Sequence, residues 1–141
     1  MLHLIKKSFA VLILLMSTSA LADHIIIKEA WLPEAAPVAK VMAAYMNITN
    51  RGTKNSSITN VSSPQFKKVE IHSMTHANGM MQMKKLDGVK LLAGKTVALE
   101  PGGFHMMLFN PKKWFEDGSN ITLNITLDNN ETFQIIAPVI K

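Results

Sequence analysis

The sequence predicts an all-β domain, folded as a sandwich or a barrel, and three observations support this prediction. Beyond residue 23, apolar and polar residues alternate over short runs, and these runs are rich in Ile, Val, Thr and Phe. Turn residues recur roughly every eight to twelve positions, a spacing typical of all-β architectures.

The first four strands are expected at 24–31, 40–50, 55–62 and 67–74. The first contains a run of three isoleucines, and the fourth alternates apolar with polar residues, as a half-buried strand does. In the second, the alanine-rich segment 38–45 offers a helix as an alternative. Residues 47–50, Asn-Ile-Thr-Asn, continue this segment in strand-like alternation and favour a strand.

Five further strands are expected at 80–86, 95–100, 104–110, 119–126 and 131–137, and turn residues separate them. Asn78-Gly79 and Asp87-Gly88 are dipeptides that accept positive φ. Pro101-Gly102-Gly103 breaks the chain sharply, and Asp128-Asn129-Asn130 separates two β-rich runs. Several of these turns are therefore predicted to close antiparallel hairpins.

Residues 1–22 are typical of a secretory signal peptide. Lys6 and Lys7 precede an apolar run, and Ala20-Leu21-Ala22 provides the small residues of a cleavage site. The run is too short for a transmembrane helix, and no later segment approaches the roughly 18 apolar residues that such a helix needs. We therefore expect an exported protein without a membrane anchor, in which residues 23–141 form one domain.

The composition excludes several classes of protein. The chain has no cysteine, so it is not a disulfide scaffold, a thiol-exchange protein, a lipoprotein anchored through cysteine or a blue-copper electron carrier. Its lysines are scattered and lack the interleaved aromatic residues of single-strand binders, so no nucleic-acid partner is expected. The basic residues are interpreted as a solvated surface, with a weak preference for an acidic partner. The acidic residues and serines form no nucleophile motif, so the protein is not expected to be an enzyme.

Residues 70–110 contain six of the ten methionines and three of the five histidines. Each methionine taken singly is more often a packing residue than a ligand. Three histidines in the same stretch are harder to explain by packing, because a histidine on an apolar face needs polar partners for its ring nitrogens. Thioethers and imidazoles together suit copper, so the cluster predicts a copper site.

Alternation along the strands groups these donors by face. His105 and Met107 project together while Met106 points into the core, because residues two apart share a face of a strand. If Asn78-Gly79 is a two-residue turn, Met74 lies opposite Met83, with His72 diagonal to it. About four ligands are expected from a pool of His72, Met74, His76, Met81, Met83, His105 and Met107.

The order His72, ten residues, Met83, twenty-one residues, His105, one residue, Met107 resembles the signature of the periplasmic PCu(A)C copper chaperones. The match requires the residue type at four positions and the three spacings between them to agree. The resemblance continues through Asn78-Gly79, 86–89, 101–103 and 45–50, and so covers nearly all of the chain beyond the signal peptide.

This resemblance implies a cupredoxin-like Greek-key β-sandwich that binds Cu(I) near its surface through His72, Met83, His105 and Met107. It further implies a periplasmic protein that delivers copper to the binuclear copper centre of cytochrome c oxidase, alongside thiol-bearing assembly proteins. The chain ends at Lys141 without the His- and Met-rich extension frequent in the family, so no Cu(II) site is expected there. Four donors exceed the signature, as substitute ligands or a second loading site: Met74, His76, Met80 and Met81.

A soluble copper carrier is therefore the leading hypothesis, because a site of two thioethers and two imidazoles can hold Cu(I) and release it to a thiolate site. The alternative is a periplasmic copper-storage or resistance protein, or a structural β-sandwich without a transfer role. His24 is interpreted as an exposed residue rather than a ligand, since no soft donor lies near it in the sequence.

Overall fold

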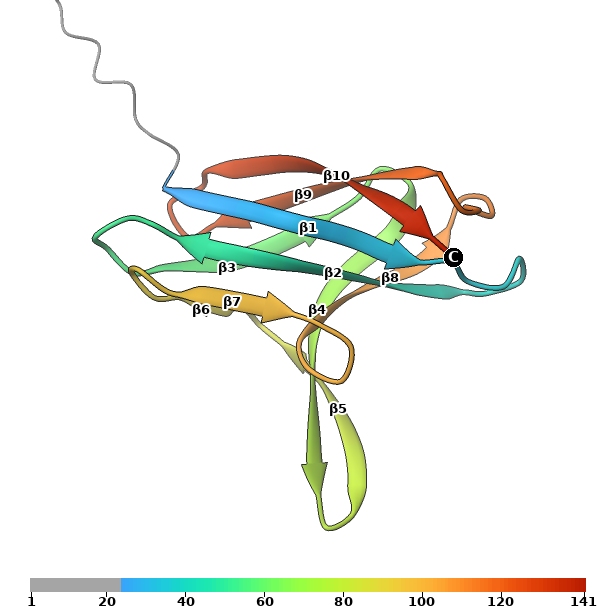
Figure 1. The fold of residues 1–141 in the computed structure, drawn as a ribbon, viewed down its shortest axis with the longest axis horizontal. Coiled ribbons are helices and arrows are strands. Elements are labelled where there is room, and N and C mark those ends of the chain that lie inside the picture. The colour runs from blue at the N-terminus through green and yellow to red at the C-terminus, as the bar shows by residue number, and fades with distance from the viewer. Residues whose placement is uncertain (1–23) are drawn as a thin grey trace, which may run out of the picture.

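The structure, a computed structural model, describes residues 24–141 and is built from strands (Figure 1). The predicted signal peptide, 1–22, lies outside the described residues. Within 24–141, no helix is long and apolar enough to cross a membrane. The strands are β1 (Ile25–Pro33), β2 (Val41–Asn50), β3 (Ser56–Ser62), β4 (Phe66–Ala77), β5 (Met80–Leu86), β6 (Val89–Leu91), β7 (Thr96–Leu99), β8 (His105–Pro111), β9 (Asn120–Leu127) and β10 (Thr132–Ile140).

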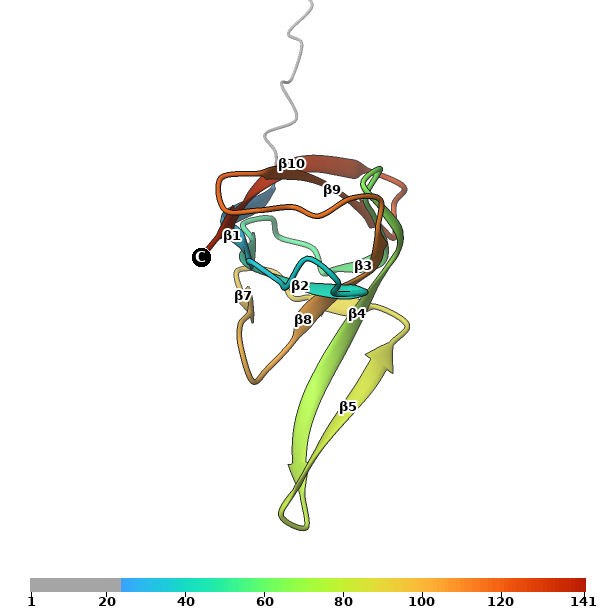
Figure 2. The same cartoon turned by 90° about the vertical axis from the view of Figure 1, so that its right-hand side faces the viewer.

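The strands pair in the order β5-β4-β8-β2-β1-β10-β9-β3-β6, with β7 also paired to β2. This path folds back on itself, so that β10, β9 and β3 face β1, β2 and β8 across the interior (Figures 1 and 2). The change of layer occurs at β1. Its first part pairs antiparallel with β2, whereas Leu32 and Pro33 at its end pair parallel with β10. The predicted sandwich is confirmed.

The core consists of the inward-facing residues of both layers. β2 alternates buried and half-buried residues along its whole length, which settles the segment from Val41 onward as a strand rather than a helix. β8 contributes Met106 and Leu108, and β9 contributes Ile121, Leu123 and Ile125; none of these five side chains is more than 1% exposed. The sandwich therefore has a continuous apolar interior, whose burial supplies most of the stabilisation.

The β4–β5 hairpin projects from the body of the sandwich, as both views show (Figures 1 and 2). Its turn residues Asn78 and Gly79 have φ values of 53° and 74°. Positive φ at both central positions fixes a two-residue hairpin, so Ala77 pairs with Met80. The predicted register, with Met74 opposite Met83, is confirmed.

All nine predicted strands are present, and the differences concern β6 and the lengths of two strands. β6 has only three residues and is stabilised as a strand by its pairing with β3. β4 continues to Ala77 because β5 pairs with it up to the turn. β10 continues to Ile140, where it pairs with the end of β1. The partners of β6 and of the β10 extension are distant in the sequence, whereas β4 extends against its hairpin neighbour.

Candidate metal centre

The site lies on the outer face of the layer formed by β5, β4, β8 and β2. The antiparallel register of β4 and β8 places Glu70 opposite Met107 and His72 opposite His105. Residues that pair directly share a face of the sheet. Ile71 and its partner Met106 are buried in the core. The two neighbouring pairs, Glu70 with Met107 and His72 with His105, therefore point outward.

His72 and His105 form a cross-strand pair of imidazoles. Their ring centroids are 5.8 Å apart, and the ring planes are tilted by 34°. His105 is 5% exposed, and the side chain of His72 is 12% exposed. Two largely dehydrated imidazoles lie side by side here, and their ring nitrogens need partners other than water.

The tautomer of His105 follows from its hydrogen bond. Its Nδ1 lies 3.2 Å from the carbonyl oxygen of Gly103. A carbonyl oxygen only accepts, so Nδ1 carries the proton and donates it. In the neutral ring, Nε2 then keeps its lone pair and is available as a metal ligand.

His72 is oriented by a carboxylate. Its Nε2 lies 2.8 Å from Oε2 of Glu70, which leaves Nδ1 with the lone pair in the neutral ring. This Nδ1 is buried and has no hydrogen-bond partner within residues 24–141. A buried ring nitrogen without a partner is costly unless a ligand satisfies it. A carboxylate that holds one nitrogen while the other faces a metal is a common arrangement in metalloproteins.

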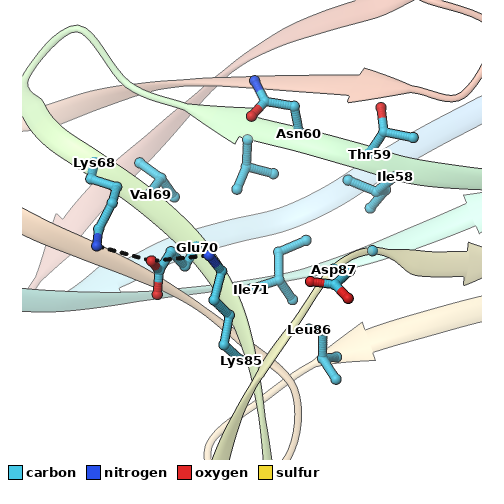
Figure 3. A pocket seen from close by; sticks show the side chains of 12 residues that line it. Ile58, Thr59, Asn60, Lys68, Val69, Glu70, Ile71, Lys85, Leu86 and Asp87 are labelled. Atoms are coloured by element: carbon cyan, nitrogen blue, oxygen red, sulfur yellow. Dashed lines mark ion pairs between the residues drawn. The ribbon is translucent and has the colours of Figure 1, made fainter.

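Glu70 is held as an anion by its neighbours. The hydrogen bond to His72 contributes most, with a hydrogen bond from Lys68 and the charges of Lys68 and Lys85, and together they lower the pKa of Glu70 to about 2. The Nζ atoms of Lys68 and Lys85 lie 3.0 and 3.5 Å from Oε1, and both reach it in Figure 3. Glu70 is therefore ionised at neutral pH and accepts a hydrogen bond from the Nε2–H group of His72.

A groove borders this anion. It has a volume of about 310 Å³ and is lined by residues 58–61, 68–71 and 85–88, from β3, β4 and the end of β5 (Figure 3). Glu70 lies in its wall, whereas neither histidine is among its lining residues. The groove therefore gives solvent access to the Glu70 carboxylate.

The register places both thioethers next to this histidine pair. Met107 follows His105 by two residues on the same face of β8, and Met106 between them is fully buried, as predicted. Met83 pairs with Met74, which puts it diagonal to His72. His105, Met107 and Met83 are therefore each beside or diagonal to His72, within the reach of long side chains.

The other predicted donors continue along the same face toward the hairpin tip. Met74 is half-buried, whereas His76 and Met81, which pair with each other, are exposed. His24 is exposed just before β1, as expected. Within residues 24–141, no three His, Cys, Asp or Glu side chains gather as a metal site. Imidazole and carboxylate donors alone therefore do not complete a shell in this part of the chain.

Sequence reasoning missed two groups. Glu70 lies two residues before His72, so the alternation that grouped the donors also places Glu70 on their face. The role of the Gly103 carbonyl oxygen has no sequence signal. The site was expected near the surface. It lies on the outer face of its layer, where Met83 is 49% exposed, while His105 is 5% exposed.

Comparison with known families decides the affiliation. The family model described as "Putative lipoprotein LpqE-like" matches residues 25–139, which is nearly the whole described chain. The chain belongs to the LpqE-like family. Among curated relatives of this LpqE-like protein, "Putative lipoprotein Lxx21020" of Leifsonia xyli is 27% identical over 119 residues, covering 84% of this chain and 70% of the relative.

Solved structures show the same fold. The "Copper-bound PCuAC domain from PmoF2" superposes with a TM-score of 0.69 at 21% identity, over 83% of this chain and 92% of that domain. The structure "CuI-DR1885 from Deinococcus Radiodurans" gives a TM-score of 0.69 at 22% identity, over 89% and 83% of the two chains. The expected cupredoxin-like sandwich of the PCuAC type is therefore confirmed.

Proposed function

We propose that this LpqE-like protein is a periplasmic copper chaperone. It binds one Cu(I) through His72, Met83, His105 and Met107, and delivers the ion to the binuclear copper centre of cytochrome c oxidase. Residues 1–22 direct export and are cleaved, and residues 23–141 form the copper-binding domain. Thiol-bearing assembly proteins are the expected companions in delivery.

The observation that carries this proposal is the pair formed by His72 and His105. An oxygen acceptor holds one nitrogen of each ring, and the buried Nδ1 of His72 has no partner among the described residues. Such fixed tautomers prepare both rings to act as neutral ligands. A purely structural histidine pair would be expected to satisfy this nitrogen within the protein.

The thioethers favour Cu(I) as the ion. Met83 and Met107 add soft sulfur donors next to the two imidazoles, and soft thioether ligands select Cu(I) over the harder divalent ions. Two solved structures with this fold are copper proteins, one named "Copper-bound" and one "CuI". Both names agree with the ion that the donors of this chain favour.

The neutral ligands suit a carrier. Four uncharged donors add no negative charge to Cu(I), so a recipient with thiolate ligands can outcompete them. Met83 is 49% exposed, so one side of the site is open to a partner. A recipient thiolate can therefore bind the ion from the hairpin side before the imidazoles dissociate from it.

Competition titration with a chelator that forms a coloured complex with Cu(I) tests the binding step. The purified residues 23–141 should remove one equivalent of Cu(I) from bicinchoninate under anaerobic conditions, and His72→Ala should weaken this binding strongly. Met42→Leu, a change on the buried core face of β2, is the control and should keep the wild-type affinity. Binding of no Cu(I), or equal binding by His72→Ala, would overturn the proposal.

Delivery needs a separate measurement. The Cu(I)-loaded protein is mixed with the soluble domain of the oxidase subunit that carries the binuclear copper centre, and the copper content of each is measured after separation. Transfer of the ion to the reduced recipient is expected. If copper stays with the LpqE-like protein at equilibrium, a storage role replaces the transfer role.

A further inference from the structure

Besides Met83, the exposed half of the β4–β5 hairpin carries donors that the site described above does not use. Met80, Met81 and Met83 are 65%, 53% and 49% exposed, and every residue of β5 before Leu86 is exposed. Exposed apolar side chains in a group need an explanation, because they gain nothing from burial. Packing, the usual role of methionine, does not apply here.

The register arranges the donors of this hairpin in successive rows on one face. His76 pairs with Met81, Met74 pairs with Met83, and the next row inward holds His72 beside His105. Each row is displaced from the next by two residues, which is roughly 6.8 Å along an antiparallel strand. A continuous track of sulfur and imidazole donors therefore runs from the exposed tip to the buried histidine pair.

Met80 makes the contrast clear. It is adjacent to Met81 in the sequence and about as exposed, but alternation places it on the opposite face of the hairpin. On that face, Thr75 and Gln82 form the next pair, and neither is a soft donor. Soft donors thus gather on the face that carries the site, although the hairpin exposes both faces to solvent.

We infer that the hairpin carries a second, outer Cu(I) site formed by Met74, His76 and Met81. This inference rests on the proposed copper-carrying function and extends it. His76 and Met81 lie directly opposite each other, with Cβ atoms about 5 Å apart in such pairs, and Met74 lies two residues from His76 on the same face. The three donors are soft or borderline and neutral, as Cu(I) prefers.

The outer site differs from the inner one in exposure and in donor number. It has three donors on a solvent-exposed hairpin, whereas the inner site has four beside the sandwich. The outer site therefore binds the ion more weakly and exchanges it faster. Passage inward needs no electron or proton transfer, because Cu(I) exchanges the thioethers and imidazole of one row for those of the next.

Methyl NMR on methionine-labelled protein tests the outer site. Residues 23–141 carrying ¹³C-methyl methionine are titrated with Cu(I) under anaerobic conditions. The first equivalent is expected to shift the Met83 and Met107 methyl signals, and the second to shift those of Met74 and Met81. The Met80 signal should stay in place throughout. Met81→Leu should weaken the second event by at least about tenfold, since even groups that only orient a ligand contribute this much to metal affinity.

Met80→Leu is the matched control, because it changes an equally exposed neighbour on the other face, and it should keep both events. Absence of a second event, its survival in Met81→Leu, or an equal shift of Met80 would overturn the outer site. The first event separates the two proposals. If the first equivalent shifts neither the Met83 nor the Met107 signal, the inner site fails. If the first equivalent shifts these signals but no second event follows, only the outer site fails.

Discussion

The carboxylate of Glu70 determines which nitrogen of His72 is available to a metal. It holds Nε2 at 2.8 Å and is itself held by Lys68 and Lys85, so the imidazole has little freedom to turn. The lysine side chains remain mostly exposed, which makes these ion pairs weak sources of stability. Their main effect is to keep Glu70 ionised and positioned.

Replacing Glu70 should therefore weaken copper binding without removing a ligand. Glu70→Ala is expected to lower Cu(I) affinity by about 10–100-fold, the usual effect of losing a group that orients a ligand. Glu70→Gln keeps an oxygen acceptor and should lose less. Chelator competition measures both, with Glu131→Gln, an exposed carboxylate in the connection between β9 and β10, as the control. An unchanged affinity in Glu70→Ala would show that His72 is oriented by other means.

Methionines on the two faces should give opposite phenotypes. Met106→Ala empties a fully buried site, and such changes cost about 2–5 kcal/mol of unfolding free energy. Met83→Ala removes a half-exposed proposed ligand, so it should weaken Cu(I) binding and leave the thermal midpoint nearly unchanged. Thermal melts of the apoprotein and chelator competition separate the two effects. Loss of affinity without loss of stability in Met106→Ala would contradict the assignment of faces.

The turn of the β4–β5 hairpin determines where Met83 lies. Asn78 and Gly79 set the register, and a slip by one residue would turn every side chain of β5 to the other face. The sequence was sufficient to predict this register, because a two-residue turn is a local feature. It was not sufficient to predict that His72 pairs with His105, since β4 and β8 are far apart in the chain and no turn joins them.

Strain in this turn should therefore lower the Cu(I) affinity more than strain in other turns does. Gly79→Ala places a side chain at φ 74°, in open space, and the left-handed conformation costs about 1–2 kcal/mol. Opening of the hairpin then lowers Cu(I) affinity by up to about tenfold, the factor equivalent to 1.4 kcal/mol.

Gly94→Ala provides a matched control, because Gly94 has φ 73° and equally open surroundings in the turn before β7. Both variants should lose similar stability in chemical denaturation. Only Gly79→Ala should lose copper affinity in chelator competition. Equal copper affinities of the two variants would mean that the hairpin does not help to hold the ion.

In the molecule as a whole, the residues that stabilise the fold are different from the residues proposed to bind copper. The interior of the sandwich is apolar, and the proposed ligands lie on the outside of one layer, so the core forms without the metal. Alternation and turn spacing predicted the all-β architecture and a pool of seven donors on one face. The choice of four ligands from this pool came from the family resemblance and stays a prediction. The sequence did not predict the burial of His105, which lies beside the distant strand β4. It also did not predict the contact of His105 with the Gly103 carbonyl oxygen, which depends on the conformation of the turn before β8.

Copper affinity should fall as the pH is lowered from about 7 to 5, because protons compete for imidazoles, which titrate near pH 6.5 in peptides. Thioethers do not titrate, so the loss should be partial. The pKa of Glu70 is about 2, so its carboxylate stays ionised over this range. Chelator titrations should show about one to two protons taken up per ion released. An affinity independent of pH would mean that methionines alone hold the ion.

X-ray absorption at the copper edge of the protein loaded with one equivalent of Cu(I) tests the proposed ligand set most directly. We predict a shell of two nitrogen and two sulfur neighbours, from His72, His105, Met83 and Met107, with the sulfur contribution reduced in Met107→Leu. A shell that contains only nitrogen and oxygen, or one that is unchanged in Met107→Leu, would contradict the proposed site.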